Sequence, residues 1–324
     1  MIHADARRDA LERWLAPHIG AAFDLTPASE DASFRRYWRA LLDDGRTYVA
    51  MDAPPGKEDC RPFVRVARML AAAGVHAPRV IAEDLASGFL LLSDLGTRTY
   101  LQELNAQNAA QLFADAIDAM LRWQLATRAG ELPPYDEALL RREMSLFPEW
   151  YVGKHLKKDL TAAQRDALEG IFRLLVESAL AQPAVYVHRD YMPRNLMVCE
   201  PNPGVLDFQD AVIGPISYDI VSLLRDAFIS WEEERVLDWS VRYWEKAKGA
   251  RLPVAGDFGE FWRAFEWMGL QRHLKVLGIF ARINYRDGKP RYLADTPRFI
   301  DYLLSVSRRY RDLAPLARLL DELA

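Results

Sequence analysis

One hairpin constrains this chain more than any other feature of its sequence. Two short apolar segments, Leu196–Cys199 and Val205–Phe208, are separated by Glu200–Gly204, in which Pro, Asn and Gly are typical of a turn. Because the connection is so short, the two segments are expected to pair as antiparallel strands. The residues at the ends of this hairpin therefore lie close together.

The register of the hairpin decides which side chains meet. A turn centred on Asn202 pairs residue 197 with residue 207. Asn195 then becomes a diagonal neighbour of Asp207 on one face, roughly 7–8 Å away at the backbone. Amide and carboxylate oxygens are ligands that Mg²⁺ accepts, at about 2.1 Å. We therefore expect Asn195 and Asp207 to hold a magnesium ion.

An aspartate precedes the hairpin at a spacing that phosphoryl transfer uses. Asp190 ends the sequence His-Arg-Asp, and Asn195 follows after four further residues, with the pair Asp-Phe at 207–208 downstream. Transfer of a γ-phosphoryl group needs a carboxylate that orients the attacking hydroxyl and a metal that neutralises phosphate charge. Asp190 is the candidate base, and ATP and Mg²⁺ are the expected cofactors.

Hydrophobic patterning predicts two lobes. The 324 residues, half of them hydrophobic, suffice for a large core. We expect an α+β fold of the bilobal protein-kinase type, with a small β-rich N-terminal lobe (residues 1–95), a hinge near residues 93–96, and a large, mainly helical C-terminal lobe (residues 96–324). The expected strands are Tyr37–Leu42, Thr47–Ala53, Val80–Ala82 and Phe89–Leu92. The expected helices are Phe63–Leu70, Thr99–Gly130, Asp136–Trp150, Thr161–Ala181 and most of the chain after Tyr218.

Charge and cysteine content exclude several classes of partner. The net charge of −4 is too small to favour nucleic acid or an anionic membrane. Cys60 and Cys199 are far apart and fit neither a disulfide framework nor a metal motif, which is typical of a reducing compartment. The charged first 15 residues do not resemble a secretion signal, and no apolar run is long enough to span a bilayer. We expect a cytoplasmic protein without an obligate protein partner.

The catalytic segment, together with its continuation Gly214–Asp219, resembles that of the aminoglycoside phosphotransferase-like kinases. Three further stretches, Ala32–Tyr37, Met51–Pro55 and Gly278–Tyr292, are similar to the bacterial branch that phosphorylates N-acetylmuramate and N-acetylglucosamine in cell-wall recycling. The similar stretches are spread over nearly the full length. The resemblance implies ATP-dependent phosphorylation of a small amino sugar at its C1 hydroxyl.

Two neighbours of the base have expected roles in the catalytic loop. The resemblance implies that Asp219 steadies this loop. Arg189, directly before Asp190, either contacts the substrate or braces the loop.

The expected nucleotide site lacks a glycine-rich phosphate loop. Ser33 and the backbone amides around Phe34 could still bind a phosphate, as such loops do in this family, with Arg35 beside them. At the expected hinge, Ser93 and Leu95 would offer backbone groups to adenine.

Met51 departs from the kinase pattern. Residues 48–51 align with a strand that in protein kinases ends in a lysine, which pairs with the α- and β-phosphates. Methionine carries no charge, so another cation has to serve. Arg35, Arg36 and Lys57 are the candidates in the same lobe.

The C-terminal segment is the expected acceptor site. Residues 250–324 contain 13 Lys and Arg against 9 Asp and Glu, although the whole chain is acidic. A basic lining suits an acceptor with a carboxylate, such as the lactyl group of N-acetylmuramate, better than a polycationic aminoglycoside. The candidate residues are Arg272, His273, Lys275, Arg282, Asn284 and Arg286.

Two alternatives remain open from the sequence. The acceptor could be another small alcohol, either an aminoglycoside or a choline-like compound. The chain could also be a pseudokinase that binds a nucleotide without turning it over, a hypothesis that Met51 favours and that Asp190, Asn195 and Asp207 oppose.

Overall fold

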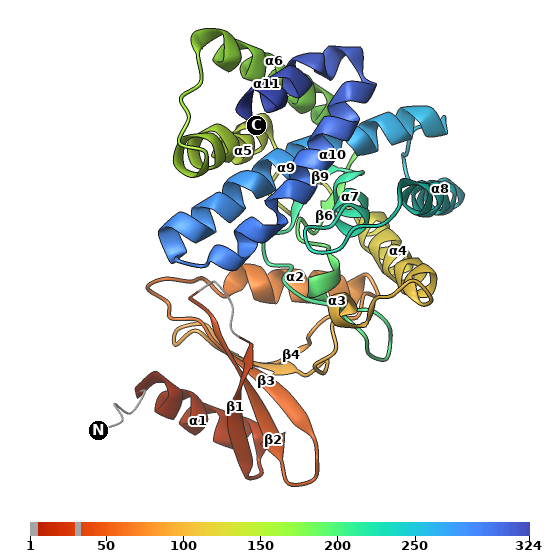
Figure 1. Ribbon diagram of the computed structural model, residues 1–324. Helices are drawn as coiled ribbons and strands as arrows, with labels where there is room; N and C mark the ends of the chain where they lie inside the picture. Colours follow the sequence, from red (N-terminus) through yellow and green to blue (C-terminus); the bar gives the residue numbers. More distant parts are fainter. Residues whose placement is uncertain (1–5, 30–33) are drawn as a thin grey trace. The chain divides into compact units, whose positions relative to one another are not determined.

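The computed structural model describes residues 6–29 and 34–324 (Figure 1). Its contacts divide the chain into two compact units. Unit 1 joins the described residues up to Glu103 to Arg194–Asp210, and unit 2 contains Leu104–Pro193 and Ala211–Ala324. The expected division into a β-rich part and a mainly helical part is confirmed. The hinge near residues 93–96 stays a prediction, because the change of unit falls later and the hairpin segment belongs to unit 1.

Unit 1 is built on a five-stranded antiparallel sheet with the strand order β1-β2-β3-β5-β4. Helix α1 (Ala6–Ile19) packs on one face, because Leu11 and Leu15 lie one turn apart and join Ala50 and Leu91 in one buried cluster. The remaining elements are β1 (Phe23–Ser29), β2 (Arg36–Leu42), β3 (Thr47–Asp52), α2 (Arg61–Ala72), β4 (Val80–Asp84), β5 (Phe89–Ser93) and α3 (Tyr100–Glu103).

The four strands expected from the sequence are present, but β1 was not predicted. Its Pro27 argues against a strand in sequence reasoning, because proline cannot donate to a ladder. The strand lies at the edge of the sheet and pairs only with β2, with a register shift between Pro27 and Ser29. An edge strand tolerates proline. The sequence alone does not show that Phe23–Ser29 lies at an edge, and this is why the strand was not predicted.

The hairpin of unit 1 exists, but its predicted register is wrong. Strand β7 (Leu196–Met197) pairs with β8 (Gly204–Val205), so residue 197 faces residue 204 and not residue 207. Gly204 is a strand residue at which a side chain has no room, since a Cβ would lie 2.8 Å from both Leu95 Cδ1 and Cys199 Sγ. The turn is therefore displaced toward the N-terminal side.

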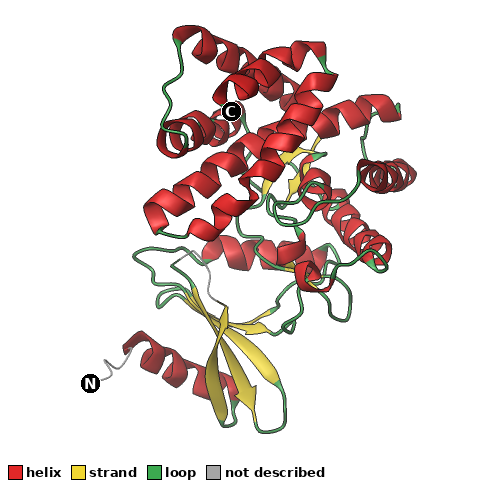
Figure 2. Ribbon diagram, viewed as in Figure 1, coloured by secondary structure: helices red, strands yellow, loops and turns green. Residues whose placement is uncertain are grey.

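Unit 2 is mainly helical (Figure 2). The long helix α9 (Phe258–Asp287) is buried over most of its length and packs against at least seven other elements of the described chain. A Cβ at Gly278 would lie 2.3 Å from the Leu146 carbonyl carbon, so glycine permits this close approach. The other α-helices of unit 2 are α4 (Ala109–Leu125), α5 (Glu137–Met144), α6 (Ala162–Leu180), α7 (Tyr218–Leu224), α8 (Glu233–Gly249), α10 (Thr296–Arg309) and α11 (Ala314–Leu323).

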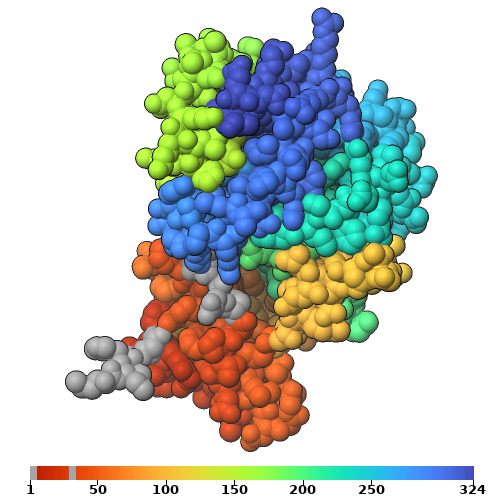
Figure 3. Space-filling view, viewed as in Figure 1, coloured from red at the N-terminus to blue at the C-terminus, as the bar shows by residue number. Residues whose placement is uncertain are grey.

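Shorter elements complete unit 2. Predicted helix Asp136–Trp150 is in fact α5 followed by a π-helix, η1 (Phe147–His155), and the strands β6 (Ala184–Val187) and β9 (Val212–Pro215) were not predicted. The C-terminal helix α11 packs against α6, as the surface view also shows (Figure 3). Unit 2 also contains the 3₁₀ segments η3 (Pro290–Asp295) and η4 (Arg311–Leu313), whereas η2 (Pro193–Asn195) lies where the chain passes from unit 2 to unit 1. None of the helices in the described residues is long and apolar enough to cross a membrane.

Candidate active site

The catalytic loop begins where β6 ends. Val187 pairs with Val212 of β9, and the buried His188 follows. The carboxylate of Asp219, in the first turn of α7, accepts the backbone N–H of His188 at 2.7 Å and that of Arg189 at 3.1 Å. Burial raises the pKa of Asp219 to about 7, against the effect of these two donors. Asp219 therefore holds the loop through its backbone, as the resemblance implied.

Asp190 lies at the edge of this loop and is half-buried. Its backbone N–H donates to His188 Nδ1 at 3.2 Å, so a hydrogen bond within the loop also stabilises the conformation of the loop. Arg189 has a φ of 75°, in the left-handed region that non-glycine residues rarely adopt.

Glu143 of α5 is the centre of a buried polar cluster in unit 2. One carboxylate oxygen accepts Arg189 Nη2 at 2.5 Å and Lys275 Nζ at 2.9 Å. The other accepts the Tyr135 hydroxyl and, at 3.3 Å, Gln271 Nε2. Burial would raise the pKa of Glu143, but the two cations lower it to about 2. Arg189 is thus held at both its backbone and its guanidinium, which favours the bracing role.

Sequence reasoning did not identify Glu143. It stands in an ordinary amphipathic helix, and its partners Arg189 and Gln271 lie 46 and 128 residues away. No local spacing could have indicated these contacts.

The two predicted metal ligands meet in unit 1. Asn195 Nδ2 donates to Asp207 Oδ2 at 3.3 Å, and the backbone N–H of Leu206 donates to the Asn195 carbonyl at 2.9 Å. Gln209 Nε2 donates to the other Asp207 oxygen at 3.0 Å, a contact that sequence reasoning missed. Asp207 reaches Asn195 despite the different register because it lies beyond β8 with a φ of 62°. The predicted proximity is confirmed.

The Asn195–Asp207 pair suits Mg²⁺ better than it suits a metal ion that is coordinated by protein ligands alone. The described residues contain no group of three or more His, Cys, Asp or Glu side chains that could hold a metal ion. Magnesium is usually bound by one or two carboxylates together with water and substrate phosphates. Asp207 and Asn195 offer oxygen ligands of that kind, and their metal role stays a prediction.

The predicted nucleotide residues are spread over unit 1. Ser33 lies outside the described residues, and Phe34 is exposed with Lys57 Nζ 4.4 Å from its ring centroid. Arg35 pairs with Glu58 at 3.3 Å. At the end of β5, the Ser93 hydroxyl accepts the Arg79 N–H at 2.9 Å, while Leu95 is buried beside Gly204. Their roles in nucleotide binding stay predictions.

Met51 is fully buried in β3, between Tyr37 of β2 and Leu90 of β5. Next to it, the buried carboxylate of Asp52 accepts both Arg36 and Arg7 at 2.5 Å. Two guanidinium groups thus share one aspartate at the end of β3. Arg36 stays a candidate for the cation that replaces the missing lysine.

Helix α9 does not bring the acceptor candidates together. Arg272 and His273 are buried in its middle, whereas Arg286 is exposed near its end and pairs with Asp287 at 2.7 Å. Arg282 and Asn284 are half-buried between them. Fourteen residues of α-helix separate Arg272 from Arg286, or about 21 Å. One small acceptor cannot contact both ends of this set.

The two buried candidates also differ in charge. Burial lowers the pKa of His273 well below its ordinary value, and its ring stacks on Tyr302 with the centroids 4.9 Å apart. His273 is therefore neutral. Arg272 acts electrostatically on the buried acids Asp219 and Asp226, which favours a structural role.

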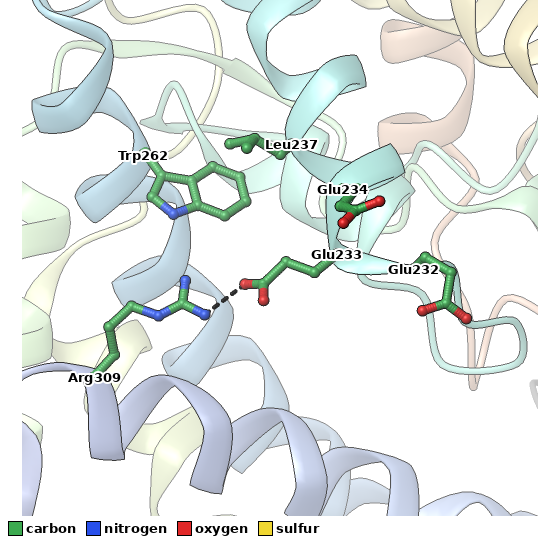
Figure 4. Close-up of a pocket in the computed structure, with 6 residues that line it drawn as sticks. All are labelled: Glu232, Glu233, Glu234, Leu237, Trp262 and Arg309. Atoms are coloured by element: carbon green, nitrogen blue, oxygen red, sulfur yellow. Dashed lines mark hydrogen bonds and ion pairs between the residues drawn. The ribbon is translucent and has the colours of Figure 1, made fainter.

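A separate hollow of about 460 Å³ lies at the start of α8 (Figure 4). Glu233 pairs there with Arg309 of α10 at 2.6 Å. Its acidic lining does not suit an acceptor with a carboxylate. The lining residues are Glu232, Glu233, Glu234, Leu237, Trp262 and Arg309.

The model of the Phosphotransferase enzyme family matches residues 24–255 of this chain. The chain therefore belongs to the phosphotransferase enzyme family. It is 54% identical to the N-acetylmuramate/N-acetylglucosamine kinase of Pseudomonas putida, over 98% of this chain and 97% of that protein. It is 52% identical to the protein of the same name from Neisseria meningitidis serogroup B, over 98% of this chain and 96% of that protein.

Solved structures show the same fold at low sequence identity. A choline/ethanolamine kinase family protein from Mesorhizobium loti has a TM-score of 0.64 at 14% identity, covering 97% of this chain and 99% of that one. The streptomycin–ATP–APH(2″)-IIa ternary complex has a TM-score of 0.60 at 16% identity, covering 92% of this chain and 97% of that one. The kinase-like fold expected from the sequence is confirmed.

Proposed function

We propose that the protein is an ATP- and Mg²⁺-dependent kinase that phosphorylates the anomeric hydroxyl of N-acetylmuramate and N-acetylglucosamine in the cytoplasm, as a step of cell-wall recycling. The observation that carries this proposal is identity above 50% with kinases of those two sugars over nearly the whole chain. Its chemistry is supported by a braced catalytic loop and by the Asn195–Asp207 contact.

Each residue has a defined part in the proposed reaction. Asp190 orients the acceptor hydroxyl and takes its proton as the oxygen attacks the γ-phosphorus of ATP. Asn195 and Asp207 would hold Mg²⁺, which supplies positive charge beside the phosphates. Asp219 keeps Asp190 in place, because both backbone N–H groups before it are bound to its carboxylate.

The charges near Asp190 disfavour a polycationic acceptor. Glu143 faces the two cations Arg189 and Lys275, and Lys275 also acts electrostatically on Asp190. An aminoglycoside would bring further positive charge to this place. A pseudokinase is disfavoured because the base and both metal ligands are present.

A turnover assay tests the proposal. ADP release with Mg²⁺ is measured on N-acetylmuramate, N-acetylglucosamine, kanamycin and choline, for the wild type and for Asp190→Asn. We expect turnover on the two sugars alone, and a loss of at least a hundredfold in kcat for Asp190→Asn, since general base catalysis contributes about 10²–10⁴-fold. Unchanged ATP affinity in the variant would show that its site is intact. Turnover on kanamycin or choline alone would refute the acceptor, and equal rates for both proteins would refute the base.

A further inference from the structure

Lys275 is a cation in the interior of unit 2 whose role the proposed mechanism leaves open. Its Nζ donates to Glu143 Oε1 at 2.9 Å and to the Tyr218 hydroxyl at 3.0 Å. Its side chain is 10% exposed, so solvent reaches part of it. Burial would lower its pKa, but Tyr218, Glu143 and Asp190 raise it, so the ammonium is charged at neutral pH.

The cluster around Lys275 holds more positive than negative charge. Glu143 is ionised, and one of its oxygens accepts from both Arg189 and Lys275. These three groups carry a net charge of +1 at largely buried positions, with 18% of the Arg189 side chain and 10% of the Lys275 side chain exposed, and such a charge is costly unless a further anion lies nearby. In the described part of the chain, the anion outside the cluster that acts on Lys275 is Asp190.

The ammonium group also has hydrogen-bonding capacity to spare. It has three N–H donors, and within residues 6–29 and 34–324 the structure gives it two acceptors. One donor and a small exposed surface are therefore left for an oxygen of a bound molecule.

We propose that Lys275 binds the carboxylate of the lactyl group of N-acetylmuramate and thereby sets the preference for this sugar over N-acetylglucosamine, which lacks that group. The inference rests on the proposed function, because it requires the acceptor hydroxyl to lie at Asp190. An acceptor held there lies within the electrostatic reach of Lys275. A charge-assisted hydrogen bond between ammonium and carboxylate is among the stronger contacts available to a ligand.

Lys275 suits this role better than three other candidates of α9, namely Arg272, His273 and Arg286. Arg272 acts on two buried acids, Asp219 and Asp226, and Arg286 is bound by the carboxylate next to it in sequence. His273 is neutral. Lys275 combines a charge, a donor to spare and an electrostatic interaction with the base.

The test compares the two sugars in one protein. We expect Lys275→Met to lower kcat/KM at least tenfold more for N-acetylmuramate than for N-acetylglucosamine, mainly through KM, because the first sugar alone would lose a charge-assisted hydrogen bond. Both sugars share any loss that comes from the broken contact with Glu143, so the ratio of the two kcat/KM values is the quantity that reports on the carboxylate contact. Lys275→Arg, which keeps the charge, should retain most of the preference, and the exposed Lys246→Met serves as control.

Each other outcome has a defined meaning. An equal loss on both sugars would overturn the proposal, since Lys275 would then act on the base or the fold. An unchanged ratio of the two kcat/KM values would overturn it as well. If Lys275→Met does not fold, the proposal is tested with Lys275→Arg and with the methyl ester of N-acetylmuramate. The wild type should have a similar kcat/KM for this ester and for N-acetylglucosamine. A kcat/KM for the ester as high as that for N-acetylmuramate would refute the carboxylate contact. Inactivity of the wild type on both sugars would instead refute the proposed function.

Discussion

At the residue scale, Glu143 shows how one buried carboxylate orders a catalytic loop. It binds two cations and two neutral donors, so all of its lone-pair directions are used. Removing one partner of such a buried ion pair leaves charge without compensation and typically costs about 3–5 kcal/mol. The position of Arg189, and with it the start of the loop, depends on this carboxylate.

The lowered pKa of Glu143 gives a prediction about acid stability. A carboxyl with a pKa of about 2 in the folded protein and an ordinary value of 4.5 stabilises the fold above pH 4.5 and loses that contribution as the pH falls toward 2. Glu143→Gln should therefore unfold at lower urea than the wild type at pH 7. Below pH 4.5 the difference in unfolding free energy should shrink by about 1.4 kcal/mol per pH unit.

Urea unfolding of both proteins at pH 7, 5, 4 and 3.5 measures this difference. Other carboxyl groups titrate equally in the two proteins, so the comparison isolates Glu143. A gap that stays constant down to pH 3.5 would contradict the proposed ionic cluster.

The residues proposed to act in the reaction could be predicted from the sequence only where they lie near one another along the chain. Asp190 and Asn195 stand in one short segment, and Asp207 follows within a hairpin. Glu143 and Gln209 were missed: Glu143 because its contacts join distant parts of the chain, and Gln209 because an amide beside an aspartate carries no signal of its own.

At the element scale, the hairpin shows the limit of turn chemistry as a guide. Proline, asparagine and glycine indicated a turn, yet Gly204 is a strand residue whose lack of a side chain permits contact with Leu95 and Cys199. Sequence cannot distinguish a glycine that turns the chain from one that allows close packing. The π-helix η1 was missed for a related reason, because it continues the apolar spacing of α5 with a different hydrogen-bond pattern.

Gly204→Ala tests the close packing of the hairpin. The added Cβ would lie 2.8 Å from two side-chain atoms and 3.2 Å from Met197 Cβ, so we expect a loss of about 1–3 kcal/mol. Gly170→Ala is the control, because its Cβ would meet nothing within 4 Å in α6, and alanine favours a helix by up to about 1 kcal/mol. Urea unfolding measures both, and a Gly204→Ala protein as stable as the wild type would contradict the packing argument.

At the scale of the whole molecule, the sequence predicted a β-rich part and a helical part but not where the hairpin belongs. The hairpin follows the catalytic loop in sequence, yet it is bound to unit 1 by backbone hydrogen bonds. Val205 N–H donates to the His76 carbonyl at 2.7 Å, and Val198 N–H donates to the Arg98 carbonyl at 2.8 Å. Such contacts between distant segments leave no pattern in a single sequence.

This arrangement assigns the predicted base and the predicted metal ligands to different units, with Asp190 in unit 2 and both Asn195 and Asp207 in unit 1. The connection between them is only four residues long. One short segment therefore links the two parts of the proposed chemistry.

The position of the phosphate in the product tests the central claim most directly. The enzyme is incubated with ATP, Mg²⁺ and N-acetylmuramate, and the product is examined by ³¹P NMR with coupling to the sugar protons. We predict a phosphate monoester coupled to the anomeric proton, formed by the wild type and absent with Asp190→Asn. A phosphate coupled to any other sugar proton, or no phosphorylated sugar while choline or kanamycin is phosphorylated, would contradict the account.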